Sequence, residues 1–172
     1  MSPRDAFAGG HESDPLVATF SLAGNWFGLN ALDVQEVLRS QPMTGVPGAA
    51  EGIEGLINLR GQVVLAYDLR HGLGLPRRGP DEKVMMMVLG SGVEPIGLLV
   101  DRIGDVIGVP AASVLPPPET LEGALQGVVS GIHQMGSDLL LILDTGSVIE
   151  RVLQPASGPD DDELSDPGPV RP

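Results

Sequence analysis

Short runs in which apolar and polar residues alternate are the most frequent pattern in this sequence. In "LVATFSL", residues 16–22, the side chains of Leu16, Ala18, Phe20 and Leu22 fall on one side of an extended chain. Because successive side chains of a strand point to opposite faces, this period predicts a half-buried strand. The tight "AGN" that follows and the "WFGL" after it predict a hairpin.

Apolar runs of similar length recur along the rest of the chain. Glycine, proline and short polar groups separate them at spacings typical of all-β barrels and sandwiches. The runs are "GLINLR", "QVVLAYDL", "KVMMMVLG", "PIGLLVDR", "DVIGV", "GVVSGIHQ" and "DLLLILD". Two of them, "VMMMVL" and "DLLLIL", are apolar on both faces, which predicts strands between two layers and places the three methionines in the core. The predicted fold class is therefore mostly β.

Two segments have helical spacing instead. In "NALDVQEVLRS", residues 30–40, Asn30 is a suitable N-cap and the apolar side chains that follow gather on one side, which predicts a short internal helix. In "DTGSVIERVL", residues 144–153, Asp144 can cap and apolar residues repeat every three or four positions. This second pattern predicts a C-terminal helix.

The two ends differ in composition from the body. Residues 1–15 and 154–172 are rich in Gly, Ser, Asp and Pro and have no apolar period, so we expect both to be flexible tails. The second tail is acidic, and its "DDDE" is interpreted as a solvated run that aids solubility. The folded domain is expected to comprise residues 16–153.

Net charge narrows the choice of partners. The chain carries 23 acidic and 10 basic residues, a formal charge of −13, so most of its surface would repel nucleic acid and anionic lipid. The N-terminus does not resemble a signal peptide, and no apolar run approaches the roughly 20 residues that cross a bilayer. We expect a soluble, cytoplasmic protein that does not insert directly into membranes.

Residue types with reactive side chains give little indication of catalysis. The chain has no cysteine, its three histidines have no metal-ligand spacing, and nucleotide-binding motifs are absent, so neither a metal nor a cofactor is expected. A carboxylate-based hydrolase remains an alternative, since aspartates are plentiful, although aspartate at strand ends commonly bonds to local backbone. Its acid/base pair would come from Asp68, Asp101, Asp105, Asp138 and Asp144.

One arginine between two strand-like runs has two interpretations. In "GLINLRGQVVLAYDLR", a strand from Gly55 places Leu56, Asn58 and Arg60 on one side, with Gly61 next to the arginine. A guanidinium projecting from a sheet edge offers a planar fork to carboxylates and carbonyls. Periodicity alone does not separate this contact role from ordinary solvent-side polarity.

Six segments follow one another along the chain: "FGLNALDVQEVL", "PMTGVPGAAEGIEG", "GLINLRGQVVLAYDLR", "IGLLVDRIGDVIGV", "VVSGIHQMGSDLLLILD" and "DTGSVIERVL". Together and in this order they resemble the CheW family, the adaptors of bacterial chemosensory arrays. They cover about residues 16 to 153. The resemblance implies two intertwined five-stranded SH3-like barrels that share a hydrophobic core, and no catalysis.

The resemblance also implies partners and a docking face. CheW proteins couple the cytoplasmic tips of methyl-accepting chemoreceptors to the regulatory domain of the histidine kinase CheA, so recruitment from the cytoplasm to membrane-associated receptor arrays is expected. Carried over by position, the kinase-binding residues are Arg60 and Gly61. The receptor-binding residues are Val34, Glu36, Arg60, Ile96, Gly97, Leu98 and Val100.

Structural roles for the same residues stay open at this point. Val34, Leu98 and Val100 also fit a plain core, Gly97 also fits a site that relieves crowding, and Glu36 can pair with a nearby arginine in solvent. The pathway is equally open, since an adaptor of a non-flagellar system, governing pili, gliding or development, would show the same pattern.

Overall fold

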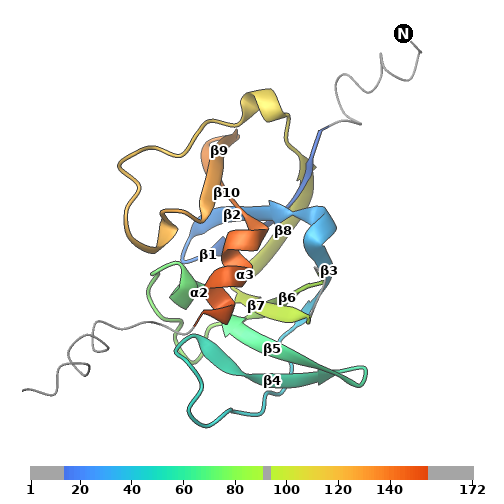
Figure 1. The fold of residues 1–172 in the computed structure, drawn as a ribbon. Helices are drawn as coiled ribbons and strands as arrows, with labels where there is room; N and C mark the ends of the chain where they lie inside the picture. Colours follow the sequence, from blue (N-terminus) through green and yellow to red (C-terminus); the bar gives the residue numbers. More distant parts are fainter. Residues whose placement is uncertain (1–13, 91–93, 155–172) are drawn as a thin grey trace, which may run out of the picture.

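The computed structural model describes residues 14–90 and 94–154 and places them in two five-stranded sheets (Figure 1). In spatial order, sheet A contains β8 (Arg102–Gly108), β1 (Leu16–Leu22), β2 (Asn25–Asn30), β10 (Asp138–Leu143) and β9 (Val129–Met135). Sheet B contains β3 (Val34–Arg39), β6 (Met85–Leu89), β7 (Ile96–Val100), β5 (Gln62–Asp68) and β4 (Ile53–Leu59). The helical elements are η1 (Ala31–Asp33), α2 (Leu69–Gly72), η2 (Ala111–Ser113), η3 (Gly123–Leu125) and α3 (Thr145–Leu153).

The chain passes from one sheet to the other and back. It starts sheet A with β1 and β2, builds all of sheet B with the next five strands, and returns to sheet A with β8 to β10. Within each sheet most neighbours are antiparallel, and β2 with β10 and β5 with β7 form the two parallel pairs. Most of both expected tails lies outside the described residues. No helix among the described residues is long and apolar enough to span a membrane.

Each sheet curls so that its two edges meet. In sheet A, Leu115, which follows β8, exchanges two backbone hydrogen bonds of 2.8 Å with Ile132 of edge strand β9. In sheet B, Thr44, which follows β3, does the same with Leu56 of edge strand β4, at 2.9 and 2.8 Å. In both sheets the chain leaving one edge strand thus reaches the other edge, as a small barrel requires.

A glycine stands next to each of these bridges. A Cβ atom on Gly131 would overlap the side chain of Val114, and one on Gly55 would lie 2.7 Å from the carbonyl oxygen of Thr44. The obstacle is backbone at Gly55 and a branched side chain at Gly131, so a larger residue at either position would force its neighbour to move.

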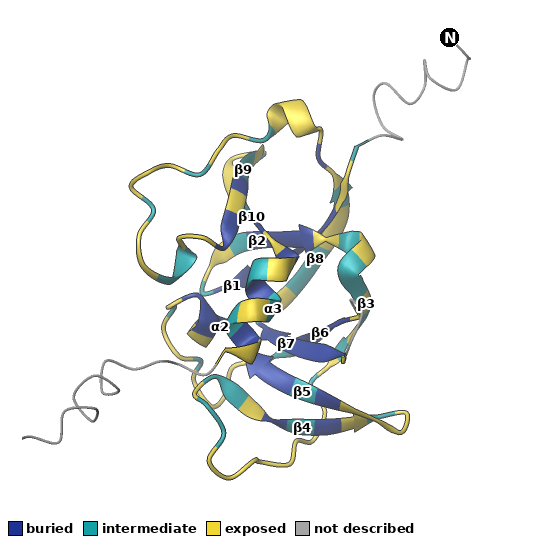
Figure 2. Cartoon of the chain, viewed as in Figure 1, coloured by how far each residue is buried: buried dark blue, intermediate teal, exposed yellow. Residues whose placement is uncertain are grey.

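The apolar residues form three clusters that explain the two-barrel organisation. Figure 2 shows buried residues along strands of both sheets. One cluster lies within sheet A around Val17, Val109 and Leu140, and another lies within sheet B around Ile57, Val64 and Met86. The third and largest draws side chains from both sheets and from α3. The expected pair of barrels with a shared hydrophobic core is therefore confirmed.

The triple-methionine strand shows how one strand serves two clusters. Met87 packs in the shared core, whereas Met86 points the other way into the cluster within sheet B, and both are fully buried. The expected core role of these methionines is thus confirmed. Strand β1 behaves similarly, so its expected half-burial is wrong: Val17 to Leu22 are all buried.

The predicted internal helix over residues 30–40 is wrong. Asn30 does cap, its side chain accepting the N–H of Leu32 at 3.0 Å, but the helical turn ends at Asp33 and β3 begins at Val34. Burial along β3 alternates with period two because the strand pairs with β6. Partner-strand pairing overrides the local helical spacing. The C-terminal helix is found as expected, with Asp144 as its N-cap.

Strand β10 is covered less than its sequence suggests. Leu140 is fully buried in the cluster within sheet A, but Leu139 is exposed near the β9–β10 turn. The expectation that "DLLLIL" is covered on both faces therefore holds for only part of the strand.

Candidate functional site

Arg60 lies in the turn of the β4–β5 hairpin, one residue beyond the strand on which it was expected. Leu59 pairs with Gln62, so Arg60 and Gly61 form a two-residue loop, and both have positive φ angles, 55° and 84°. This is the conformation of a type I′ turn, which matches the twist of the flanking strands. The Asn58 side chain supports the turn by accepting the Gly61 N–H at 2.8 Å.

The Arg60 guanidinium forms a bidentate ion pair with Glu36 of β3. Nη1 lies 2.7 Å from Oε2 and Nη2 lies 3.0 Å from Oε1. The Arg60 side chain is 74% exposed and the Glu36 side chain is 21% exposed. An exposed pair of this kind adds only about 0–1 kcal/mol to stability. The main effect of the ion pair is to fix the orientation of the exposed Arg60 guanidinium on the surface.

An apolar groove of about 600 Å³ runs beside this hairpin. It lies between the β4–β5 hairpin, the start of β7 and helix α3. Its apolar lining residues include Leu56, Val63, Leu65, Ile96, Ile149 and Leu153. Val63 and Leu153 are exposed, and Gly61 of the turn also contributes to the lining. The turn that carries Arg60 thus forms one end of an accessible apolar surface.

The other predicted site residues divide into surface and core. Val34 is half-buried at the start of β3, and Ile96 is buried but lines the groove. Leu98 and Val100 are fully buried in the shared core, and strand β7 is paired on both sides. Gly97 allows close packing, since a Cβ there would lie 2.7 Å from the Met86 sulfur. These last three residues have no surface to offer a partner.

Sequence reasoning missed the contribution of Val63, Ile149 and Leu153 to this surface. The adjacent valines of "QVVL" were a usable signal, because only one of two neighbouring strand residues can face the core. Val64 is the buried one, so Val63 points outward. The part played by α3 depends on its docking against sheet B, which no local pattern reveals.

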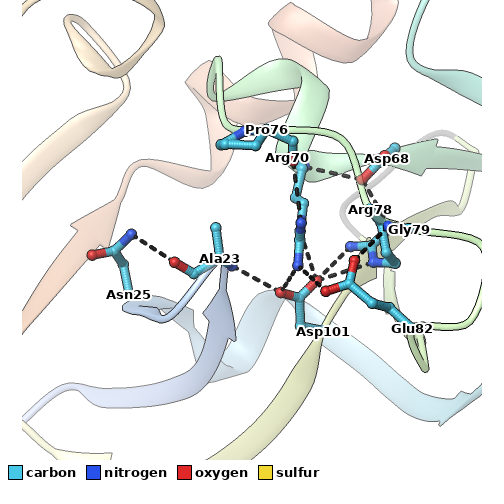
Figure 3. A network of polar contacts seen from close by, with 9 residues as sticks. All are labelled: Ala23, Asn25, Asp68, Arg70, Pro76, Arg78, Gly79, Glu82 and Asp101. Atoms are coloured by element: carbon cyan, nitrogen blue, oxygen red, sulfur yellow. Dashed lines mark hydrogen bonds and ion pairs between the residues drawn. The ribbon is translucent and has the colours of Figure 1, made fainter.

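A second cluster of polar residues lies between the sheets and is built around Asp101 (Figure 3). Its Oδ1 accepts bonds from Arg70 Nε at 3.0 Å and from Arg78 Nε and Nη2 at 3.1 and 2.7 Å. Its Oδ2 accepts bonds from Arg70 Nη2 at 2.5 Å and from the Ala23 N–H at 2.8 Å. Ala23 is in the β1–β2 turn of sheet A and Arg70 follows β5 of sheet B, so this carboxylate joins the two barrels.

Further carboxylates complete the balance of charge in this cluster. Asp68 Oδ1 lies 3.2 Å from Arg78 Nη1, and Glu82 Oε1 lies 3.6 Å from Arg70 Nη2. Burial raises the pKa of Asp101, but hydrogen bonds from Arg70, Ala23 and Arg78 outweigh it, so the pKa lies below its usual range. The hydrogen bond to Asp101 raises the pKa of Arg70, although burial opposes it. Arg70 and Asp101 thus stabilise each other's charged form.

This arrangement does not suit acid/base chemistry. Of the five aspartates proposed for a hydrolase, only Asp68 and Asp101 come together, and arginines occupy both carboxylates. A general acid needs a raised pKa, whereas that of Asp101 is lowered. Asp144 caps α3, and Asp105 and Asp138 are exposed on separate strands. Among the described residues no three His, Cys, Asp or Glu side chains are grouped as metal ligands.

The fold and the site together define a binding module: two fused β-barrels, a rigid ion cluster between them, and an exposed charged fork beside an apolar groove. Comparison with known proteins agrees with this class. The family model of the CheW-like domain matches residues 16–153. The chain belongs to this family, whose members are non-catalytic scaffold or adaptor proteins of chemotaxis signalling. The resemblance predicted from sequence is confirmed, and the hydrolase alternative is wrong.

Individual relatives cover most of this chain. Chemotaxis protein CheW of Klebsiella aerogenes is 29% identical over 134 residues, 78% of this chain and 78% of that protein. Protein FrzA of Myxococcus xanthus is 26% identical over 159 residues, 91% of this chain and 98% of that protein. The crystal structure of the scaffolding protein TtCheW from Thermoanaerobacter tengcongensis matches with a TM-score of 0.67 and 31% identity, over 76% of this chain and 88% of that one.

Proposed function

We propose that this adaptor couples the cytoplasmic hairpin tips of methyl-accepting chemoreceptors to the regulatory domain of the histidine kinase CheA. Membership of the CheW-like family supports the proposal. The single observation that carries it is the bidentate Glu36–Arg60 pair at one end of an exposed apolar groove. Charged recognition next to apolar burial is the usual composition of a specific docking surface.

The backbone of Arg60 favours a contact role over simple solvent polarity. A side chain in the left-handed region costs about 1–2 kcal/mol, which glycine at the same position avoids. Arg60 has a φ of 55° and its guanidinium is largely exposed, so neither the turn nor the core requires an arginine there. A functional contact explains why this strained residue is an arginine.

The groove supplies the apolar half of the receptor contact. A receptor hairpin presents an apolar helix face, and a helix laid in a groove is a common mode of recognition. Val63 and Leu153 offer exposed apolar surface to such a ridge, and the buried Ile96 lines the groove beneath it. Glu36 and Arg60 set its register. Val34, half-buried on the same strand as Glu36, belongs to this receptor face.

The remaining predicted residues act beneath this face. Leu98 and Val100 pack in the shared core, and Gly97 allows Met86 to lie close to β7. Their role is to hold the groove in shape. We assign kinase binding to the hairpin turn, because Arg60 and Gly61 are exposed there. Under this proposal Arg60 contacts both partners. Such contacts are individually small, and multivalency within a membrane-associated array strengthens them.

Two replacements of Arg60 test the proposal by co-sedimentation with receptor-containing membranes and CheA. Arg60→Gly removes the guanidinium while relieving the positive φ, so stability should stay within about 1 kcal/mol of the parent. Arg60→Glu also reverses the charge beside Glu36. Both variants should give a native circular dichroism spectrum and reduced co-sedimentation.

Arg102→Glu is the matched control, because Arg102 is an exposed arginine on β8 of the other sheet. Its charge reversal should leave co-sedimentation unchanged. Undiminished co-sedimentation of Arg60→Gly would refute the role assigned to the turn.

A second candidate is an adaptor of a non-flagellar chemosensory pathway. The relatives of this chain are not all named chemotaxis protein CheW, since FrzA matches over 91% of this chain and 98% of that protein, so family membership does not fix the pathway. Isolation of the tagged chain from its native cell, with identification of the kinase and receptors by mass spectrometry, separates the two pathways.

A further inference from the structure

The curled sheet A has a cavity of about 700 Å³ that shares no lining residue with the apolar groove. It opens onto the cluster within sheet A, and we call it the sheet A pocket. Its apolar lining residues include Val17, Val109, Val114, Leu115 and Ile142. Its volume is within the range of protein ligand sites, about 300–1,000 Å³.

The charge around the sheet A pocket is of one sign. Its charged lining residues are Asp33 and Asp144, and in residues 14–90 and 94–154 neither forms an ion pair. Asp144 Oδ2 accepts the Ser147 N–H and hydroxyl, which offsets the partial positive charge at the start of α3. Within the described chain the Asp33 carboxylate accepts no hydrogen bond, so it is free to meet a cation.

Apolar surface continues beyond the cavity. Leu32 lies in η1, between the lining residues Asn30 and Asp33, and is 87% exposed. Leu115 lines the pocket and is also exposed. A small molecule inside the cavity would leave Leu32 in water, whereas a polypeptide can fill the cavity and cover its surroundings.

We propose that the sheet A pocket binds a segment of another protein in which a bulky apolar side chain neighbours an arginine or lysine. The apolar side chain packs against Val109 and Val114, and the cation lies beside Asp33. Charge complementarity fixes this choice, because the lining offers carboxylates and no basic group. The inference does not depend on assigning the groove to receptors.

The test is a titration of the ¹⁵N-labelled full chain, followed by amide NMR. The probe is acetyl-Gly-Leu-Arg-Leu-Gly-amide. Two matched peptides replace the arginine by citrulline, its neutral isostere, or both leucines by serine. Saturable shifts are expected at Asp33, Val114 and Leu115, while Ile149 and Leu153, farther along α3, serve as references.

Binding of the citrulline peptide should be about two- to fivefold weaker, as expected for a partly exposed ion pair. Asp33→Asn should remove that difference, and the serine peptide should not bind. Equal binding of the arginine and citrulline peptides, or shifts confined to other surfaces, would overturn the proposal. Shifts of the pocket residues with protein concentration alone would assign the pocket to a second copy of the chain and overturn it as well.

Discussion

Replacing Asp101 by Asn should be among the most destabilising single-atom changes in this protein. The Asp101 carboxylate accepts five hydrogen bonds from Arg70, Arg78 and Ala23, and its side chain is only 14% exposed. The substitution Asp101→Asn keeps the shape of the side chain but removes the negative charge between the buried guanidinium of Arg70 and the largely buried one of Arg78. Both arginines then lose their main counter-charge.

The size of the effect follows from the burial of the cluster. Removing one partner of a buried ion pair costs about 3–5 kcal/mol. Asp68 and Glu82 still lie near Arg78 and Arg70, at 3.2 and 3.6 Å, so the lower end, about 3 kcal/mol, is expected. With an unfolding entropy of about 2.1 cal/mol/K per residue over the roughly 140 described residues, this lowers Tm by about 10 °C.

Thermal unfolding followed by circular dichroism measures this change, with Asp105→Asn as the control. Asp105 is exposed on β8, and the control should stay within about 0.5 kcal/mol of the parent. A Tm of Asp101→Asn within about 2 °C of the parent, on the order of 0.6 kcal/mol by the same conversion, would refute the idea that this cluster holds the barrels together.

Three further predictions follow from the same structure. The pKa of Asp101 is lower in the folded state than its ordinary 3.8. The stability that the carboxylate contributes is therefore full above pH 3.8 and is lost as pH falls through the folded pKa. The urea midpoints of the parent and of Asp101→Asn should accordingly converge as pH falls below about 4. Leu98→Ala should cost about 2–5 kcal/mol in urea unfolding, because the side chain is fully buried, and a smaller loss would contradict its core role. Asp144→Ala should cost about 1 kcal/mol through loss of the α3 cap, whereas Asp144→Asn should restore most of it.

Most strands were predictable because they carry a local signal in their sequence. Alternation or two-sided apolarity marks β1 and β6 locally, and the turn residues between runs mark their ends. Residues 34–39 were mistaken for helix because their spacing fits both periods, and pairing with β6 decides the outcome. Because β6 lies far along the chain from residues 34–39, no local sequence pattern predicts this pairing.

The site was less predictable than the fold for the same reason. The sequence singles out Arg60 as a candidate contact residue, but it does not reveal the bond to Glu36, which joins residues 24 positions apart. Asp101 bonds to Arg70, which lies 31 positions away in the sequence. That this bond joins the two barrels is known only from the sheet topology. Leu98 and Val100 lie on a strand paired on both sides, so their burial depends on strand order, which sequence alone does not give.

The central claim is that the β4–β5 turn and the apolar groove form the docking face. Amide NMR of the ¹⁵N-labelled chain, titrated with a soluble fragment of a receptor hairpin tip, tests it most directly. The account predicts that the shifts cluster at Glu36, Gly61, Val63 and Leu153 and vanish in the Arg60→Gly variant. Shifts confined to sheet A, or unchanged binding by that variant, would contradict it.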